Sequence, residues 1–259
     1  MNSIAEVVKD GDLILLYFNK REKIVTEVKS GEVLYTYKAV IKFNDIIGLP
    51  YGTKIKLKNG TQVIISRPRL EDIAYTAFIR KTQVLYPKDI GLIIIKSGIG
   101  PGSHVVEAGS GSGVLTAYLA YFVRPTGHVY SYEVRPEFLE AARRNISLLG
   151  LNNVVTFKLQ DITKGIDEDK IDAIVLDMAS PWTVVKHAWN KLKHGGAFIS
   201  FVPTVNQMEK VVLELRNYGF IEIEPFEVIL RSYKVAMGET RPASLRIPHT
   251  GYIVSAHRP

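Results

Sequence analysis

The sequence predicts an α/β protein in which a small antiparallel β domain precedes a doubly wound parallel sheet. Residues 11–66 hold short runs of β-branched and aromatic residues separated by turns. From about Ile73 onward, strand-like and helix-like segments alternate. This alternation implies right-handed crossover connections and therefore a parallel sheet with helices on both faces.

The strand-like runs of the first region cover residues 13–18, 23–28, 32–41, 53–57 and 61–66. Turn signals separate them at Gly31, at residues 48–52 and at Asn59-Gly60. An Asn-Gly pair between alternating runs is a strong hairpin signal. We therefore expect a small antiparallel barrel or sheet over residues 1–70 and a second domain over residues 71–259.

The second region predicts strands at residues 104–108, 129–134, 154–160, 173–177 and 197–203, and helices at 136–149, 182–192 and 205–217. The first of these helices has Pro136 at an early position and Gly150 just after its end. Residues 220–230 and 251–256 are strand-like with no helix between them. They predict an antiparallel pair at the sheet edge.

Composition excludes several functional classes. The chain has 259 residues with 46% hydrophobic and 23% charged residues, which is typical of a globular protein. It has no apolar run of about 20 residues and no signal-peptide pattern, so we expect a cytoplasmic protein with no membrane contact. Cysteine is absent, which excludes disulfides and thiolate nucleophiles. His187 and His194 lack carboxylate partners at ligand spacing, so no metal site is predicted.

Positive charge is concentrated in the first quarter of the chain. Residues 1–70 contain 12 Lys/Arg and 7 Asp/Glu, whereas residues 71–259 contain 21 and 19. A basic surplus of this kind favours an anionic partner. A solvated face that serves only solubility is the alternative.

A glycine-rich loop follows the first strand of the second region. Gly109, Gly111 and Gly113 recur at a spacing of two before a helix that begins near Val114. A dinucleotide site has the pattern G-x-G-x-x-G, and here the third glycine comes one residue early. Glu107 at the strand end would repel a pyrophosphate and suits a cationic ligand that carries an amino acid.

Acidic residues end the next strands as well. Glu133, Asp161 and Asp177 follow consecutive strands and therefore share the rim where open α/β sheets bind ligands. Glu133 can accept hydrogen bonds from ribose hydroxyls, and Asp161 can accept one from an adenine amino group. Singly, each could be a loop carboxylate or a helix cap. Together with the glycines they predict a nucleoside-bearing methyl donor.

The segment from Asp177 to Trp182 follows the fourth strand. A carboxylate beside an aromatic ring suits a planar base that becomes cationic on methylation, because the ring covers the base and the carboxylate stabilises the developing charge. Two other interpretations stay open: Asp177 could cap the following helix, and Trp182 could be part of the core.

Several of these segments recur together in a known family. Residues 82–89 (TQVLYPKD), 107–113, Glu133, Asp161, 177–182 and 249–252 occur in that order. The chain thereby resembles the tRNA (adenine-N1)-methyltransferases that modify the T-loop adenosine at position 58 and, in archaeal members, also at position 57. The resemblance implies a class I, Rossmann-like methyltransferase fold with a seven-stranded, mostly parallel sheet, S-adenosyl-L-methionine as cofactor, tRNA as partner and a homotetramer.

The resemblance also assigns residues. Asp177 would be the catalytic residue, and residues bordering the substrate would be Tyr86, Trp182, Arg241, His249 and Tyr252. The cofactor would be held by Gln83, Val84, Glu107, Gly109, Ser110, Gly111, Ser112, Gly113, Val114, Glu133, Asp161 and Asp177. Ala179-Ser180 departs from the family, which often has proline or glutamate there.

The implied reaction is a direct displacement by the adenine N1 lone pair, governed by orientation and charge stabilisation. The T-loop base must be flipped out, which costs on the order of a few kcal/mol. Phosphate contacts by Lys54, Lys56, Lys58, Arg67 and Arg69 would offset this cost. The alternatives are another class I methyltransferase, of the protein isoaspartyl or corrinoid-precursor type, and a non-catalytic RNA-binding subunit.

Overall fold

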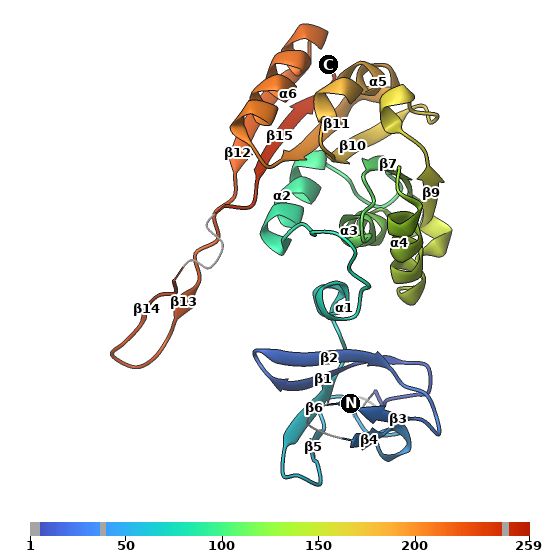
Figure 1. The fold of residues 1–259 in the computed structure, drawn as a ribbon, viewed down its shortest axis with the longest axis vertical. Helices are drawn as coiled ribbons and strands as arrows, with labels where there is room; N and C mark the ends of the chain where they lie inside the picture. The colour runs from blue at the N-terminus through green and yellow to red at the C-terminus, as the bar shows by residue number, and fades with distance from the viewer. Residues whose placement is uncertain (1–5, 37–39, 245–248) are drawn as a thin grey trace, which may run out of the picture. The chain divides into compact units, whose positions relative to one another are not determined.

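The computed structural model describes residues 6–36, 40–244 and 249–259 (Figure 1). The chain divides into two compact units, residues 1–78 and 79–259. The division falls after helix α1 (Leu70–Thr76), whereas the sequence placed it after residue 70. Buried Asp72 of α1 forms an ion pair of 2.9 Å with Lys23, which ties the helix to the first unit.

The first unit contains an antiparallel sheet with the strand order β2-β1-β6-β5. Its strands are β1 (Leu13–Asn19), β2 (Glu22–Glu27), β5 (Lys54–Lys56) and β6 (Gln62–Ser66). The hairpin predicted at Asn59-Gly60 joins β5 to β6, and the Leu57 amide donates to the Thr61 carbonyl at 2.8 Å. Ile14, Leu16, Val63 and Ile65 lie in the core of this unit.

One strand prediction in this unit was wrong. Residues 32–41 do not form a single strand but two, β3 (Val33–Tyr35) and β4 (Val40–Lys42), which pair with each other antiparallel. A short 3₁₀ helix, η1 (Phe43–Asp45), follows. The alternation of side chains is the same in one long strand and in two arms of a hairpin, so the pattern did not reveal the reversal.

The second unit is built on a seven-stranded sheet with the order β12-β15-β11-β10-β7-β8-β9. The strands β7 (His104–Ala108), β8 (His128–Glu133), β9 (Val155–Leu159), β10 (Ile171–Asp177) and β11 (Leu192–Val202) are parallel. The strand β15 (Tyr252–His257) is antiparallel to β11 and to β12 (Ile221–Glu227). The predicted parallel sheet with an antiparallel pair at its edge is therefore confirmed.

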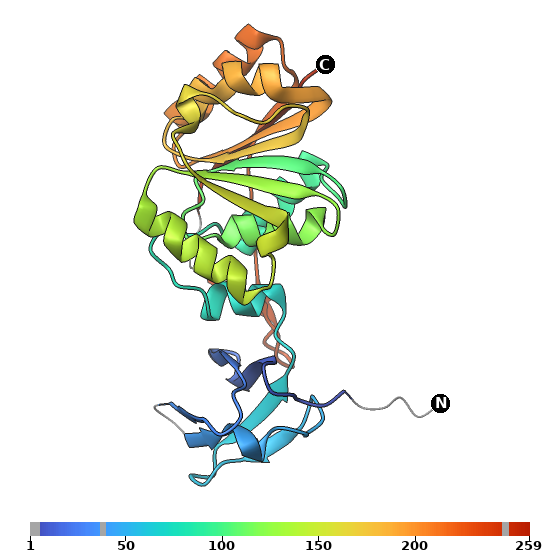
Figure 2. The same cartoon turned by 90° about the vertical axis from the view of Figure 1, so that its right-hand side faces the viewer.

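Helices cover both faces of this sheet (Figures 1 and 2). The helices α2 (Pro87–Ser97), α3 (Val114–Val123) and α4 (Pro136–Leu148) pack on one face, and α5 (Val185–Lys191) and α6 (Val205–Tyr218) on the other. Short 3₁₀ helices lie at Asn152–Val154 (η2), Ile162–Lys164 (η3) and Pro181–Val184 (η4). The helix predicted over 182–192 is thus η4 followed by α5, and Leu192 already belongs to β11.

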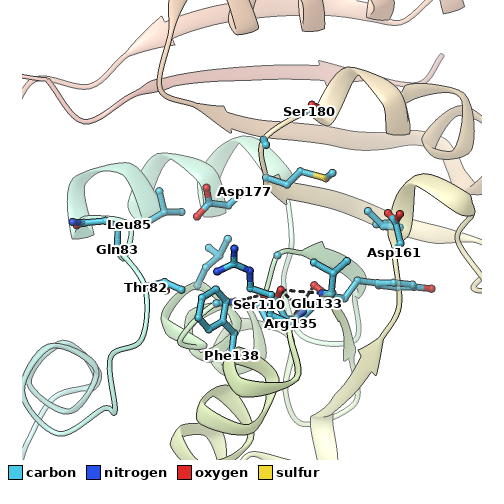
Figure 3. A pocket seen from close by; sticks show the side chains of 18 of the residues that line it. Thr82, Gln83, Leu85, Ser110, Glu133, Arg135, Phe138, Asp161, Asp177 and Ser180 are labelled. Carbon is cyan, nitrogen blue, oxygen red and sulfur yellow. Dashed lines mark hydrogen bonds between the residues drawn. The ribbon is translucent and has the colours of Figure 1, made fainter.

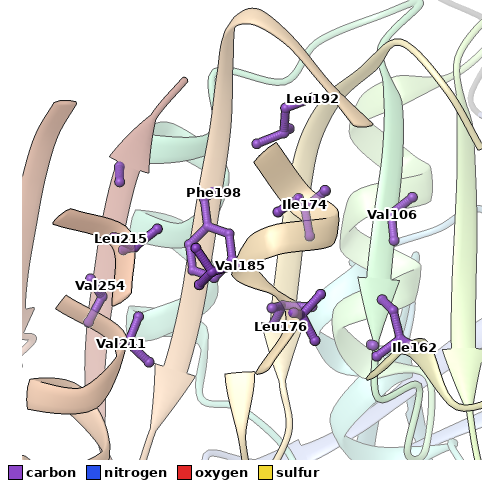
Figure 4. Close-up of a cluster of buried hydrophobic side chains, with 14 of the residues drawn as sticks. Val106, Ile162, Ile174, Leu176, Val185, Leu192, Phe198, Val211, Leu215 and Val254 are labelled. Atoms are coloured by element: carbon purple, nitrogen blue, oxygen red, sulfur yellow. The ribbon is translucent and has the colours of Figure 1, made fainter. Parts of the chain in front are cut away.

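The main core lies between the sheet and α5 and α6 (Figure 4). Val106 of β7, Ile174 of β10 and Phe198 of β11 point toward Val185 and Leu215 of these helices, and all five are fully buried. Side chains alternate along a strand, so their direct neighbours face α2 and α3 instead. This alternation decides where Glu107 points.

Between β12 and β15 lies an arm, which we define by its described residues, 229–244 and 249. It carries the short strands β13 (Tyr233–Lys234) and β14 (Arg241–Pro242), which pair as a hairpin beyond the ends of β12 and β15 (Figure 1). Apolar side chains are exposed along the arm at Ile229, Leu230 and Met237. In the part of the chain that the structure describes, no helix is long and apolar enough to cross a membrane.

Candidate active site

A cavity of about 610 Å³ opens at the carboxyl ends of the central strands. Strand β7 lies between β8 and β10, so the strand order reverses at this point, and such a switch point is where open α/β sheets bind ligands. The volume lies within the range of roughly 300–1,000 Å³ that is typical of small-molecule sites. Residues 82–85, the loop after β7 and the ends of β8 to β10 form its walls (Figure 3).

The backbone amides of the glycine-rich loop donate hydrogen bonds to residues at the ends of both neighbouring strands. The Gly109 amide donates to the Asp177 carbonyl at 3.1 Å, and the Gly111 amide donates to Glu133 Oε2 at 3.0 Å. Gly111 has a φ of +52°, and a Cβ there would lie 2.9 Å from Thr82 Oγ1. The loop therefore needs glycine to bring its backbone this close to the cavity wall.

Ser112 joins this loop to residues 79–82. Its Oγ accepts hydrogen bonds from the amides of Lys81 (3.0 Å) and Thr82 (3.3 Å) and lies 3.1 Å from Thr82 Oγ1. Asn145 of α4 bonds both the Ser112 carbonyl (2.9 Å) and the backbone of Ile79. Ser112 does not line the cavity, but these bonds fix the segment that does.

Glu133 and Asp161 line the cavity at the ends of β8 and β9. Glu133 Oε1 accepts from the amides of Val134 and Arg135, so only Oε2, which accepts from the loop, keeps capacity for a ligand hydroxyl. Asp161 Oδ1 accepts from both the amide and the hydroxyl of Thr163, and these bonds lower the pKa of its carboxyl. Asp161 therefore caps η3 as well as lining the cavity.

Asp177 ends β10 on the opposite wall, and its side chain points into the cavity (Figure 3). Burial raises the pKa of this carboxyl to about 6. The loop that follows is tied to α6, because Gln207 Nε2 donates to the Ala179 carbonyl at 2.9 Å while Thr204 caps that helix. A partly desolvated carboxylate on a fixed loop is suited to stabilising positive charge that develops on a ligand.

Glu107, for which a contact with the cofactor was predicted, is not among the residues that line the cavity. The alternation of β7 turns it toward α3, where it is fully buried and its Oε2 accepts from Thr116 (2.7 Å) and Ser131 (2.6 Å). Ser131 Oγ lies 2.5 Å from Ser110 Oγ, so Glu107 supports the loop from beneath. Its Oε1 has no hydrogen-bond partner among the described residues.

The pKa of Glu107 is raised from 4.5 to about 8, mainly by burial and also by the neighbouring carboxylates of Asp177 and Glu133, against the hydrogen bonds from Ser131 and Thr116, which lower it. The folded protein therefore keeps Glu107 protonated at neutral pH, whereas the unfolded chain ionises it. The neutral Glu107 side chain therefore makes its full contribution to the free energy of unfolding below pH 4.5, and this contribution is lost as the pH rises through 8.

We expect Glu107→Gln, which stays neutral, to become more stable than the wild type as the pH rises. The difference relative to pH 4 should reach on the order of 3 kcal/mol near pH 7. Urea unfolding between pH 4 and 9 measures it. Parallel stability curves for the two proteins would contradict a protonated Glu107.

The structure brings most of the predicted cofactor residues together. Those that line the cavity are Gln83, Val84, Gly109, Ser110, Gly111, Val114, Glu133, Asp161 and Asp177. The predicted cofactor residues that do not line it are Glu107, Ser112 and Gly113. The predicted substrate residues do not line it either, namely Tyr86, Trp182, Arg241, His249 and Tyr252.

The residues outside the cavity occupy several places. Trp182 packs against the main core beneath Lys210 Nζ, which lies 4.9 Å from its ring centre. Arg241 is exposed on the arm. His249 and Tyr252 lie beside each other at the start of β15, with ring centres 4.9 Å apart.

Sequence reasoning missed Arg135 and Phe138, which also line the cavity. The Arg135 guanidinium lies 4.9 Å from the Phe138 ring centre and reaches into the space below Asp177 (Figure 3). Their signal was present, since they follow Glu133 at the first turn of the next helix. Among the described residues, no group of three or more His, Asp or Glu could hold a metal ion.

Comparison with known proteins gives matches along nearly the whole chain. A family model described as tRNA methyltransferase complex GCD14 subunit matches residues 59–256. The tRNA (adenine(57)-N(1)/adenine(58)-N(1))-methyltransferase TrmI of Methanocaldococcus jannaschii is 34% identical, with 94% of each chain covered.

Two solved structures share this fold. The tRNA (m1A58) methyltransferase TrmI of Aquifex aeolicus is 31% identical with a TM-score of 0.83, covering 97% of this chain and 98% of that one. A SAM-dependent O-methyltransferase of Thermotoga maritima is 33% identical with a TM-score of 0.91, covering 99% and 96%. Both resemble the chain over the two units and not only over the sheet that carries the cavity.

Proposed function

Because this chain belongs to the family of the tRNA methyltransferase complex GCD14 subunit, we propose that it is a tRNA methyltransferase that forms N1-methyladenosine at T-loop position 58. One observation carries the proposal. A single cavity brings the glycine-rich loop, Glu133 and Asp161 within one site with Asp177. A non-catalytic RNA-binding subunit would have no need to keep this set.

The residues present fit S-adenosyl-L-methionine. Glu133 Oε2 faces the loop and can accept from a ribose hydroxyl, and Asp161 Oδ2 is available to an adenine amino group. Thr82 and Gln83 lie across from the glycine-rich loop, where the methionine part of the cofactor would be held. The acidic walls suit the positive charge of this cofactor.

When bound, the cofactor supplies an electrophilic methyl group on a sulfonium. Held by Glu133, Asp161 and residues 82–83, the cofactor would supply this methyl group to the lone pair of the adenine N1 as the bond from the methyl carbon to sulfur breaks. N1 loses no proton in this step, so the protein needs no strong base. The role of Asp177 is to accept a hydrogen bond from the exocyclic amine and to stabilise the charge that develops on the ring.

The relatives leave the methylated position open to test. The Methanocaldococcus relative is named for positions 57 and 58, whereas the Aquifex structure is named for position 58 alone and the Thermotoga structure for an oxygen acceptor. Incubation of unmodified tRNA with isotope-labelled cofactor, followed by nuclease mapping and mass spectrometry, identifies the product. We expect N1-methyladenosine at position 58. A methyl group on a ribose oxygen, or none on tRNA, would refute the proposal.

The proposal includes the partners and the compartment. The exposed apolar side chains Ile229, Leu230, Val235 and Met237 on the arm support a homotetramer, since exposed apolar patches mark association surfaces. A cytoplasmic location is proposed because tRNA is the substrate.

The N-terminal unit presents a row of lysines that suits the tRNA backbone. Lys54 and Lys56 of the edge strand β5, and Lys58 just after it, alternate with partly buried residues and are exposed on one face. None of the three has an ion pair with a described residue. Arg67 differs, since it pairs with Glu6 at 2.8 Å and lies over the ring of Tyr51.

We expect the triple variant Lys54→Gln, Lys56→Gln, Lys58→Gln to bind tRNA less tightly and with a weaker salt dependence. Each lost phosphate contact should reduce the slope of log K against log salt by roughly 0.7 to 0.9. Filter binding between 50 and 300 mM salt measures the slope. Arg67→Gln is the matched control and should change it less, because its charge is already paired; equal effects would contradict the assignment.

A further inference from the structure

A buried polar cluster lies at the start of α2, directly after the cavity wall formed by residues 82–85. Lys88 Nζ lies 2.8 Å from Asp89 Oδ1 and donates to the Val228 carbonyl (2.6 Å) and to Thr250 Oγ1 (2.6 Å). Thr250 Oγ1 in turn donates to Asp89 Oδ2 at 3.0 Å. Each of the three ammonium protons therefore has a partner.

Burial of this cluster carries a desolvation cost that reduces the stability of the fold. The Asp89 side chain is fully buried, and the Lys88 side chain is 11% exposed. An ion pair taken out of water gains little net stability over apolar side chains of similar volume. The pair is therefore better explained by the chain segments that it holds in fixed positions than by a gain in stability.

The cluster joins three segments that lie far apart in sequence. Val228 follows the end of β12, and Thr250 precedes β15, so the two residues flank the arm. Lys88 and Asp89 belong to the first turn of α2, whose N-cap, Tyr86, follows the cavity wall. His249 attaches the same end of the arm a second time. Its Nδ1 lies 2.7 Å from Glu227 Oε1 and its Nε2 lies 3.2 Å from the Pro203 carbonyl.

The wall is attached to the rest of the unit at both of its ends. At its N-terminal end, Thr82 is held by Ser112 of the glycine-rich loop. At its C-terminal end, the Tyr86 carbonyl accepts from the amides of Asp89 and Ile90. Displacement of the first turn of α2 would therefore move residues 83–85 relative to the glycine-rich loop across the cavity.

We propose that Lys88, Asp89 and Thr250 are positioning residues that lock the cofactor-binding wall, residues 82–85, to both ends of the arm. Cofactor affinity then depends on how firmly the two ends of the arm are held against α2, although none of the three residues lines the cavity. The proposal rests on the proposed function only in the identity of the cofactor.

Thr250→Val tests the proposal, because it removes the hydroxyl at nearly constant shape. Calorimetric titration of the full chain with S-adenosyl-L-methionine should show about three- to tenfold weaker binding, the size expected for lost hydrogen bonds to charged groups. Lys88→Met should weaken binding in the same direction. Amide exchange at residues 83–86 should become faster in both variants.

Thr250→Ser restores the hydroxyl and should restore wild-type affinity. Thr240→Val is the matched control, since among the described residues the Thr240 hydroxyl donates to the Ala236 carbonyl within the arm at 3.1 Å, and it should bind the cofactor as the wild type does. Wild-type affinity in Thr250→Val and Lys88→Met, with or without a lower melting temperature, would overturn the proposal. Absence of cofactor binding by the wild type would instead overturn the proposed function.

Discussion

Asp177→Asn should reduce the rate of tRNA methylation by about 10²- to 10³-fold, the loss typical of removing one electrostatic contact to a transition state. Asparagine keeps the shape of the side chain at the end of β10 but removes the charge. The Gly109 amide bonds the Asp177 carbonyl rather than its side chain, so the glycine-rich loop should stay in place. Single-turnover rates at saturating tRNA and cofactor measure the loss.

The pH profile gives an independent readout of the same residue. Burial raises the pKa of Asp177 to about 6, and only the ionised carboxylate stabilises positive charge on the base. The wild-type kcat/KM should therefore rise with pH and level off above a midpoint near 6. The rise should be absent in Asp177→Asn. Wild-type rates in the variant, or a profile unchanged by it, would refute the catalytic role.

Gly113→Ala should destabilise the second unit by about 2–5 kcal/mol. The residue has a φ of +76°, which costs an alanine about 1–2 kcal/mol. An added Cβ would also lie 3.1 Å from Ala142 Cα and 3.2 Å from Ala142 Cβ, and overpacking of this kind costs about 1–3 kcal/mol. Urea unfolding measures the change, and cofactor binding should weaken because Gly113 closes the glycine-rich loop.

Two variants separate the causes of this loss. Gly150→Ala has a similar φ of +66° with nothing within 4 Å of the added Cβ, so it should lose only the part caused by backbone strain. Ala142→Gly introduced beside Gly113→Ala removes only the contact with Ala142 Cβ at 3.2 Å, so it should relieve part of the steric loss, while the contact with Ala142 Cα at 3.1 Å remains. If Gly113→Ala and Gly150→Ala destabilised the protein equally, the close contact between α3 and α4 would have no energetic role.

The strands of the second unit could be predicted well because they are bounded by glycine and by charged residues. Strand β7 was predicted at its observed bounds, and the acidic residues at the strand ends were placed on one rim. The helix α2 was not predicted, although Pro87 stands at its first position. The arm was not predicted either, since its two short strands make few contacts and leave no periodic pattern.

Residues of the candidate site could be predicted where their place at the end of a strand brings them to the cavity. They were predicted less well where the direction of the side chain decides whether it reaches the cavity. Asp177 ends β10 and Asp161 follows the end of β9, and both reach the cavity, whereas Glu107 precedes Ala108 and points toward α3. Sequence spacing could not show that Thr250 lies 2.6 Å from Lys88, because 162 positions separate the two residues.

The position of β15 in the sheet affects how the protein is made. β12 meets the rest of the sheet only through β15, although α6 and β12 are translated first. Until residues 252–257 leave the ribosome, β12 has no partner and the edge of β11 is open to wrong pairings. The second unit therefore depends on its latest-synthesised strand, and a nascent chain that stalls within the arm would expose both edges to aggregation.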